Sequence, residues 1–395
     1  MNRLWLLTLL FLLSVINSVV GQPQQFTDTV NYIDDGGAIK SIIQYKIFQS
    51  DTILDGPATY YYQTGDLWQI GYYKNNSKDS LWTIYYGNGH VSSLILFENG
   101  AKQGEFVYFY ENDTVKTKGT YLNDSLTGLV SLYFPNGQVN ETRLYEKNKL
   151  NGPTTGYYPD GNLNYRIEYV DSLKNGLYET FYPSGKLKER GYIKDKLFYD
   201  NFKSFYENGQ VEKEIIYKNC IINGPYIVYY DNGQVLSTIT YIDGKQEGPG
   251  FYYYKDGSLY ETGQYLSGKR VGLWHSYFPD STLYMEGKYD LGIANGVWNI
   301  YHLNGNLKQT GLYKDGKSEG QWYFYYPNGL VRKKGKYVSN AENGNWVHYY
   351  ENGKMKLDLY YNMSKLEGVL SGYDEDGNLI EKAEYFDNQL IKKIK

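Results

Sequence analysis

The chain is poor in cysteine, in alanine and in net charge. Its one cysteine, Cys220, excludes a disulfide within the chain. The formal net charge is −4 with both signs interspersed, so the sequence offers no basic face for nucleic acid and no polybasic membrane patch. With 48 tyrosines and 43 glycines instead, the composition is typical of strands and tight turns rather than helices.

Long apolar runs are also scarce, and the single one lies at the N-terminus. MNRLWLLTLLFLLSVINSVVGQ joins the basic Arg3 to an apolar stretch from Leu4 to Val20, followed by small residues. This pattern predicts a secretory signal peptide that is cleaved near Gly21, with a retained membrane anchor as the alternative. We therefore expect the mature chain to be secreted, or to reside in the periplasm or cell envelope.

What fills the rest of the chain is one unit of 24 residues, repeated without insertion or deletion. It occurs fourteen times between about Gly56 and Ile391. One turn position marks every copy: Gly65, Gly89, Asp113, Gly137, Gly161, Gly185, Gly209, Gly233, Gly257, Ser281, Gly305, Gly329, Gly353 and Gly377. A fixed short period indicates a repeat array rather than several globular domains.

The period divides the chain into four segments. We expect a signal peptide over residues 1–21, a degenerate N-terminal capping repeat over 22–55, the fourteen repeats over 56–391 and a charged C-terminal tail over 392–395. One repeat buries too few side chains to offset the entropy of ordering its backbone, so each repeat needs its neighbours.

Positions within a repeat are counted from the turn residue as zero. Position −4 is aromatic in every copy, as in Tyr325, and position +2 is aliphatic or Met, as in Val331. Position +8 is aromatic in all copies except one, where Ile193 stands. Alternate residues of a strand share a face, so this parity predicts one buried face that holds positions −4, +2 and +8.

Prolines define the turn between the two strands. Five copies have proline at position −2, as in Pro327. Proline cannot donate a ladder hydrogen bond, so a two-residue hairpin loop is excluded and a three-residue loop is favoured: a type I turn followed by a left-handed residue. A looser second turn, such as DGKSEG from Asp315, returns the chain. The predicted fold is all-β, an elongated array of tandem antiparallel β-hairpins with a 24-residue period and about 14 repeats.

The other face of this array also carries rings, which have two interpretations. Tyrosine recurs at position −3 and tryptophan at position −7. They could form a second packed stripe, or an exposed platform for a sugar or an extended protein segment. The densest part supplies the candidate binding surface: Tyr254, Trp274, Trp298, Trp322, Tyr326, Trp346 and Tyr350.

Catalytic patterns are lacking. The four histidines fall on different copies, and none belongs to a metal-ligand or nucleophile motif: His90, His275, His302 and His348. His302 occupies a repeat position that usually holds Tyr or Phe, so it is interpreted as a substituted ring. Gly-Lys pairs such as that at residues 268–269 recur with the turn and lack the phosphate-loop frame. We expect no enzyme activity, no catalytic residue, no metal and no cofactor.

The assembled consensus, GxWxxYYxNGxLxxxGxYxxGKxx, resembles the MORN-repeat variant found in the YwqK family of antitoxin-like proteins. GVWNIYHLNGNLKQTGLYKDGK from Gly296 and GQWYFYYPNGLVRKKGKY from Gly320 carry the resemblance, whereas the copies near Gly65 and Gly209 depart from it. The resemblance implies tandem β-hairpins and a role in protein or membrane contact, and it transfers no catalytic residue. Choline-binding cell-wall repeats are similar in composition, but their period is shorter.

We therefore expect an exported, non-enzymatic repeat protein that binds a protein or serves as a scaffold at the cell envelope or outside the cell. Two alternatives stay open: recognition of glycans or cell wall through the aromatic surface, and an exported antitoxin or immunity role. A cytosolic antitoxin would not carry a secretory signal. Nucleic acid is not an expected partner, and the sequence leaves membrane contact open.

Overall fold

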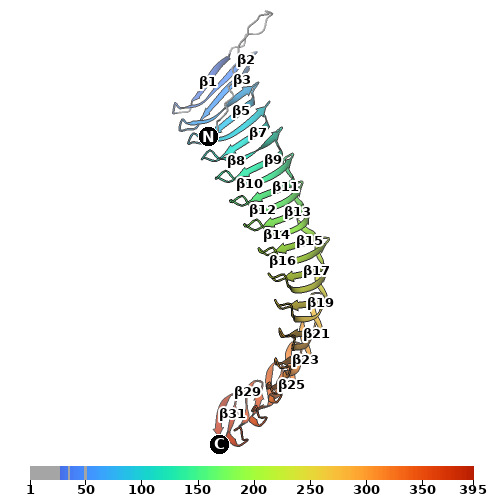
Figure 1. The fold of residues 1–395 in the computed structure, drawn as a ribbon. Helices are drawn as coiled ribbons and strands as arrows, with labels where there is room; N and C mark the ends of the chain where they lie inside the picture. Colours follow the sequence, from blue (N-terminus) through green and yellow to red (C-terminus); the bar gives the residue numbers. More distant parts are fainter. Residues whose placement is uncertain (1–26, 34–35, 49–50) are drawn as a thin grey trace, which may run out of the picture. The chain divides into compact units, whose positions relative to one another are not determined.

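The structure, a computed structural model, describes residues 27–33, 36–48 and 51–395, and strands occupy most of them (Figure 1). No helix occurs in these ranges, and the strands pair antiparallel as consecutive hairpins, which confirms the predicted all-β class. The predicted signal peptide, residues 1–21, lies outside the described residues, as does the start of the predicted cap. The described residues contain no helix that could cross a membrane.

The chain divides into two compact units. The first contains the described residues up to Val139 together with Tyr145–Asn148. Its strands are β1 (Thr27–Ile33), β2 (Ile39–Phe48), β3 (Asp51–Tyr61), β4 (Leu67–Lys74), β5 (Ser77–Tyr85), β6 (Val91–Glu98), β7 (Ala101–Phe109), β8 (Val115–Leu122) and β9 (Ser125–Tyr133). Within this unit each of these strands pairs with the next one in sequence.

The second unit contains Asn140–Leu144 and Lys149–Lys395, and β10 (Val139–Glu146) has residues in both units. Its other strands are β11 (Lys149–Tyr157), β12 (Leu163–Val170), β13 (Leu173–Phe181), β14 (Leu187–Lys194), β15 (Leu197–Phe205), β16 (Val211–Lys218), β17 (Ile221–Tyr229), β18 (Val235–Ile242), β19 (Lys245–Tyr253), β20 (Leu259–Leu266), β21 (Lys269–Tyr277), β22 (Leu283–Asp290), β23 (Ile293–Tyr301), β24 (Leu307–Lys314), β25 (Lys317–Tyr325), β26 (Val331–Val338), β27 (Ala341–Tyr349), β28 (Met355–Asn362), β29 (Lys365–Leu366), β30 (Gly368–Tyr373), β31 (Leu379–Phe386) and β32 (Gln389–Lys393). β29 and β30 both pair with β28, so they form one interrupted strand.

The turn inside each hairpin has the predicted three-residue loop. In the β25–β26 hairpin the Gly329 N–H donates to the Tyr326 carbonyl at 2.9 Å, and the Tyr326 N–H donates to the Leu330 carbonyl at 2.8 Å. Pro327 is the second residue of this turn, where its fixed φ fits and no N–H is needed. Gly329 follows with φ 85°. The second turn has two residues, both with positive φ, as in type I′ hairpins.

The register of the hairpin confirms one prediction and corrects another. Tyr325 lies opposite Val331, as expected, but the next pair is Phe324 with Lys333, so a bulge accommodates one extra residue. A bulge of one residue reverses the parity of everything beyond it. The aromatic residue at position +8, Tyr337, therefore does not share a face with Tyr325. The prediction of one face for positions −4, +2 and +8 is wrong because it did not count the bulge.

The buried face instead holds positions −7 and +6, which meet across the sheet. We call this line of residues the core row. In the second unit its C-terminal part alternates glycine and tryptophan before it reaches a leucine: Gly263, Trp274, Gly287, Trp298, Gly311, Trp322, Gly335, Trp346 and Leu359. In the first unit the corresponding buried residues include Trp82, Ile95, Phe106 and Val130.

Each indole of this glycine–tryptophan part lies directly on the backbone of a glycine eleven residues earlier. A Cβ on Gly311 would stand 2.0 Å from Cδ2 of Trp322, and one on Gly287 would stand 2.1 Å from Cδ2 of Trp298. Only glycine leaves room for this contact. The tyrosines at position +8 then close the sides of the indoles; Tyr313, for example, packs edge-on against Trp322 with ring centroids 5.2 Å apart.

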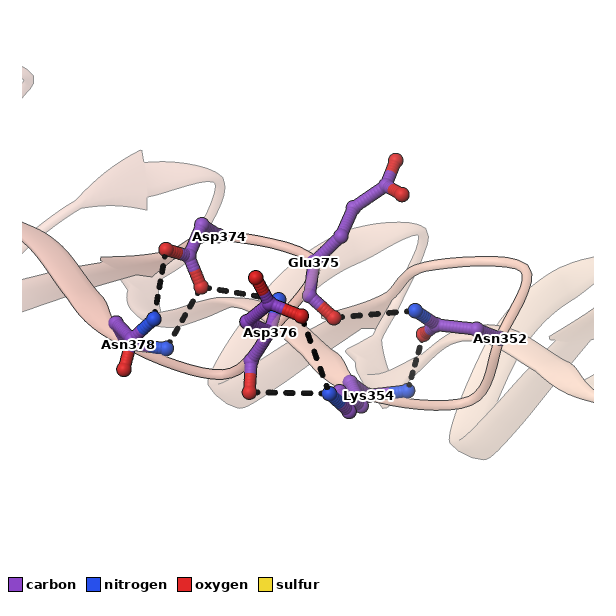
Figure 2. Close-up of polar contacts among 6 residues, drawn as sticks. All are labelled: Asn352, Lys354, Asp374, Glu375, Asp376 and Asn378. Atoms are coloured by element: carbon purple, nitrogen blue, oxygen red, sulfur yellow. Dashed lines mark hydrogen bonds and ion pairs between the residues drawn. The ribbon is translucent and has the colours of Figure 1, made fainter.

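Hydrogen bonds along the turns join most repeats to the next one. The Tyr350 hydroxyl donates to the carbonyl of Tyr373 at 2.9 Å. The Asn352 side-chain amide donates to the carbonyl of Glu375 at 3.1 Å (Figure 2). Both bonds span 23 residues, and most repeats have one or both of them. We call this series the turn-edge ladder. It gives partners to backbone carbonyls at the ends of the strands.

The last turn has a different arrangement. Asp374 occupies the position of the ladder tyrosine, and its carboxylate accepts the N–H groups of Asp376 at 3.0 Å and Asn378 at 2.7 Å within its own loop (Figure 2). Hydrogen bonds from Asn378 are the main reason that the pKa of Asp374 lies below its usual value. Turn geometry therefore accounts for this carboxylate.

Candidate functional site

Four of the seven residues predicted as a binding surface lie in the core row. Trp274, Trp298, Trp322 and Trp346 expose 2%, 8%, 3% and 0% of their surface. A ring this deeply buried cannot present its face to a ligand without local unfolding. The structure thus places the tryptophans where the packed-stripe interpretation puts them and not on an exposed platform.

The three tyrosines of the predicted surface belong to the turn-edge ladder. The Tyr254 hydroxyl donates to the carbonyl of Tyr277, and the Tyr326 hydroxyl donates to the carbonyl of Tyr349, both at 2.9 Å. Tyr350 makes the equivalent bond described above. These rings are half-buried and their hydroxyls are occupied, so they hold successive turns together and do not join the tryptophans in one surface.

The rings accessible for binding lie on the opposite side of the sheet, which we call the outer face. It carries positions −8, −6, −4, +5 and +7, and between residues 273 and 334 it consists of Leu273, His275, Tyr277, Glu286, Lys288, Val297, Asn299, Tyr301, Thr310, Leu312, Gln321, Tyr323, Tyr325 and Lys334. The aromatic position −4, shared by all repeats, lies here and is half-buried. That constancy was the signal that could have identified this face, had the bulge been counted.

A hydrogen-bonded cluster occupies the middle of the outer face. Glu286 accepts hydrogen bonds from the Asn299 amide and the Tyr301 hydroxyl, both at 2.8 Å, and Thr310 donates to Asn299 at 2.7 Å. His275 lies 3.8 Å from the Glu286 carboxylate. These neighbours, the Asn299 bond first, hold the pKa of Glu286 below its usual value. An ionised acceptor is therefore fixed in place beside aromatic rings.

Apolar side chains next to this cluster are exposed to solvent. Val297 and Leu312 form a cross-strand pair with exposed fractions of 59% and 38%. On the same face the Tyr323 and Tyr325 rings stack with an interplanar angle of 23°. Single exposed aliphatic residues are common on proteins, but an exposed pair among rings and fixed polar groups is typical of a contact surface.

The four histidines do not come together. His302 takes the place of a ladder tyrosine, and its Nε2 lies 3.1 Å from the carbonyl of Tyr325, which fits the prediction that it substitutes for a ring. His90 contacts Asp113 at 2.7 Å on an exposed turn. Within residues 27–33, 36–48 and 51–395, no group of three or more His, Cys, Asp or Glu residues is arranged to hold a metal ion.

One protein-family model, described as MORN repeat variant, matches stretches that together cover more than half of the chain. The matched residues are 54–75, 102–123, 126–147, 150–171, 174–195, 201–219, 222–243, 294–315, 318–339, 342–363 and 366–388. Repeats of this family are generally non-enzymatic binding repeats. No curated protein matches the sequence.

Two solved structures overlap with much of the chain. The first is a crystal structure of TcdB2-TccC3-Cdc42, with 11% identity over 91% of this chain and 26% of that chain and a TM-score of 0.15. The second is a Tc holotoxin pore from Photorhabdus luminescens, with 13% identity over 91% and 25% and a TM-score of 0.16. The chain spans about a quarter of their length. TM-scores this low carry no argument about fold or function.

Proposed function

Because the chain belongs to the MORN repeat variant family, we propose that it is an exported, non-enzymatic repeat protein that binds a protein partner at the cell envelope or outside the cell. The partner contacts the outer face between residues 273 and 334. The observation that carries this proposal is the asymmetry of the sheet. The core row closes one side, whereas the other side presents exposed aliphatic residues, half-buried rings and fixed polar groups in successive repeats.

The outer face has the composition that protein partners use. Val297 and Leu312 are exposed, and their burial against a partner would lower the free energy of the complex. Tyr301 and Tyr323 offer rigid rings, and the cluster around Glu286 offers acceptors that fix the register of a bound chain. A surface of this kind suits an extended partner segment better than a small molecule, which requires a deep pocket.

Crosslinking tests where the partner lies. A photoreactive residue is placed at position 297 or 312 in the native exported protein, and at position 303 as a control. Leu303 belongs to the same repeat and is 60% exposed, but it lies in the turn. We expect mass spectrometry to identify one protein that is crosslinked from 297 and 312 and absent from 303. Equal crosslinking from all three positions would contradict the proposal.

Substitution then measures what the surface contributes to affinity. With the identified partner, Val297→Ser combined with Leu312→Ser should weaken binding by about tenfold, which corresponds to about 1.4 kcal/mol. Leu303→Ser should leave binding unchanged. All three side chains are exposed, so thermal unfolding should stay close to that of the parent chain. Unchanged affinity of the double variant would overturn the assignment of the surface.

Glycan binding is a second candidate, favoured by the stacked rings of the outer face. His275 and Tyr277 stack at 24°, and Tyr323 and Tyr325 stack at 23°. Flat rings beside hydrogen-bonding groups suit a sugar ring. A pull-down with peptidoglycan and soluble polysaccharides separates the two candidates: a protein scaffold retains none of them, whereas retention that Tyr323→Ala abolishes supports glycan binding.

Export is proposed on the N-terminal sequence alone. The mass of the mature protein recovered outside the cytosol tests it: cleavage near Gly21 is the expected result, and an intact Met1 would indicate a retained anchor. An exported antitoxin or immunity role is a narrower version of the protein-binding proposal. If the crosslinked partner is a secreted toxin, the result would support the antitoxin or immunity role.

A further inference from the structure

A hollow lined by basic groups lies near the turns of the second unit. Its volume is about 410 Å³. Three successive strands and one turn contribute its lining: Arg332 and Lys333 from β26, His348 and Tyr349 from β27, Lys356 and Leu357 from β28, and Tyr326 from the turn before β26. We call it the cationic hollow.

The basic groups of this hollow are poorly neutralised. Lys333 is 3.7 Å from Glu342. Arg332 and Lys356 form no ion pair with any residue that the structure describes, and Lys356 lies 5.1 Å from the centre of the Tyr350 ring instead. Three permanent cations therefore surround the hollow with one carboxylate nearby. Their combined field favours an anion at this place.

His348 lies within that field. Its pKa is lowered first by burial and then by the cations Lys333, Arg332 and Lys356. The charged groups that face it are thus two cations from β26 and one from β28, with Glu342 of its own strand in contact with Lys333. A bound anion would offset this repulsion and let the imidazole take up a proton more easily.

The equivalent positions earlier in the second unit have a different character. Lys188 has the same place in its repeat as Lys356, and it lies over the same kind of ring, 5.6 Å from the centre of Tyr182. Position +4 of that repeat and position +3 of the next hold Glu189 and Glu212, where the two repeats of the hollow have Lys333 and Lys356. The cationic hollow is therefore not a product of the repeat pattern.

We propose that the cationic hollow binds a tetrahedral oxyanion, a phosphate or sulfate group, between Arg332 and Lys356. The planar guanidinium of Arg332 can donate two parallel hydrogen bonds to such a group, and Lys356 supplies a mobile point charge on the other side. Tyr326, whose hydroxyl donates to the Tyr349 carbonyl, lies at the rim of the hollow. The group can be free or can be the head of a lipid, since the same oxygen atoms would be recognised.

Calorimetric titration of the full chain with inorganic phosphate and with sulfate tests the proposal. Arg332→Gln and Lys356→Gln should each weaken binding by about tenfold, the effect of losing one charge-assisted hydrogen bond. Lys188→Gln is the matched control, because it removes the same charge from the same position of another repeat. Equal effects of Lys356→Gln and Lys188→Gln would overturn the site.

Two further arms make the result decisive. Vesicles containing phosphatidic acid, compared with vesicles of phosphatidylcholine alone, show whether a lipid can carry the anion; binding of these vesicles without binding of inorganic phosphate assigns a lipid source. NMR titration of His348, assigned with His348→Gln, should show its pKa rising when phosphate is added. Absence of binding in every arm, or an unmoved His348 pKa at saturating phosphate, refutes the proposal.

Discussion

The core row is built in two ways within the second unit. Between residues 263 and 346 it alternates glycine and tryptophan, so each indole has a glycine as its neighbour on the preceding strand. Between residues 154 and 250 it is mixed: Thr154, Ile167, Tyr178, Gly191, Phe202, Ile215, Tyr226, Ile239 and Gly250. The same cross-strand pairing of positions −7 and +6 persists in both parts.

This difference shows that the repeats preserve the combined size of neighbouring side chains in the core row, and not the identity of each residue. After Ile167 and Ile215 the next strand has tyrosine, and after Ile239 it has glycine. The tyrosine is partly buried and directs its hydroxyl to a polar group, as Tyr178 does to Glu189 at 3.1 Å. Where glycine stands at position +6, the next strand can hold an indole. Protein interiors are densely packed, so neighbouring positions have to change together.

Removing an indole should have the largest effect. Trp298→Ala leaves a cavity between Gly287 and Gly311, which have no side chains to fill it. We expect a loss of about 3–5 kcal/mol in the free energy of unfolding, measured by urea denaturation. Thr155→Ala, at position −6 of the mixed part, is the control and should cost far less. A loss below about 1 kcal/mol for Trp298→Ala would contradict the packing described here.

Adding one methyl group to a glycine of the row should have the next largest effect. Gly311→Ala places Cβ 2.0 Å from Trp322, whereas Gly191→Ala, at the same position of a mixed repeat, places it 3.1 Å from Phe202. Overpacking costs about 1–3 kcal/mol, and we expect the first variant to reach the top of this range and the second to stay below it. Thermal unfolding monitored by tryptophan fluorescence compares the two; a reversed order would refute the volume rule.

Single hydroxyls of the turn-edge ladder should have a smaller effect. Tyr326→Phe removes the hydrogen bond to the Tyr349 carbonyl and should cost about 1 kcal/mol. Phe278 occupies the same position of an earlier repeat, so Phe278→Tyr should add the missing bond and raise stability by a similar amount. Chemical denaturation of both variants tests this symmetry. Equal shifts in the same direction would show that ring packing, and not the hydroxyl, matters there.

The smallest expected effect concerns Cys220, the second residue of a type I′ turn with φ 63°. Four later repeats have glycine at this position, as at Gly244 and Gly268. Cys220→Gly relieves the left-handed backbone but makes the unfolded chain more flexible, so the net gain should be only about 0.5 kcal/mol. Thermal unfolding under reducing conditions measures it. A clear loss of stability would show that the contact of Sγ with the Lys194 carbonyl, at 4.0 Å, outweighs the backbone strain.

The hairpins, both turns and the pairing of Tyr325 with Val331 could be predicted from the sequence, because proline and glycine restrict the backbone locally. The faces could not. Counting alternate residues from Tyr325 to Tyr337 gives the wrong side, since the bulge after Val331 leaves no separate mark in a chain whose lysines and glycines occur on both strands. Because the faces were assigned wrongly, the sequence placed the tryptophans on the candidate surface. In the structure the accessible rings are the tyrosines of the outer face, beside its aliphatic residues.

The burial of the tryptophans could have been predicted from one further observation. Each of Trp274, Trp298, Trp322 and Trp346 follows a glycine by eleven residues, which places a ring and an empty position side by side on neighbouring strands. The cationic hollow is harder to foresee, because its basic residues belong to two different repeats and only the strand pairing brings them together.

The turn-edge ladder runs in one direction along the chain, and the aspartate at position 374, in place of tyrosine, ends it. Every ladder tyrosine donates its hydrogen bond to a residue that comes later in the chain, so a repeat is complete only when its successor exists. Asp374 instead bonds within its own loop. A duplicated 24-residue unit inserted between two repeats that have this bond could therefore keep it, whereas one appended after this loop would lack the ladder bond from position −3.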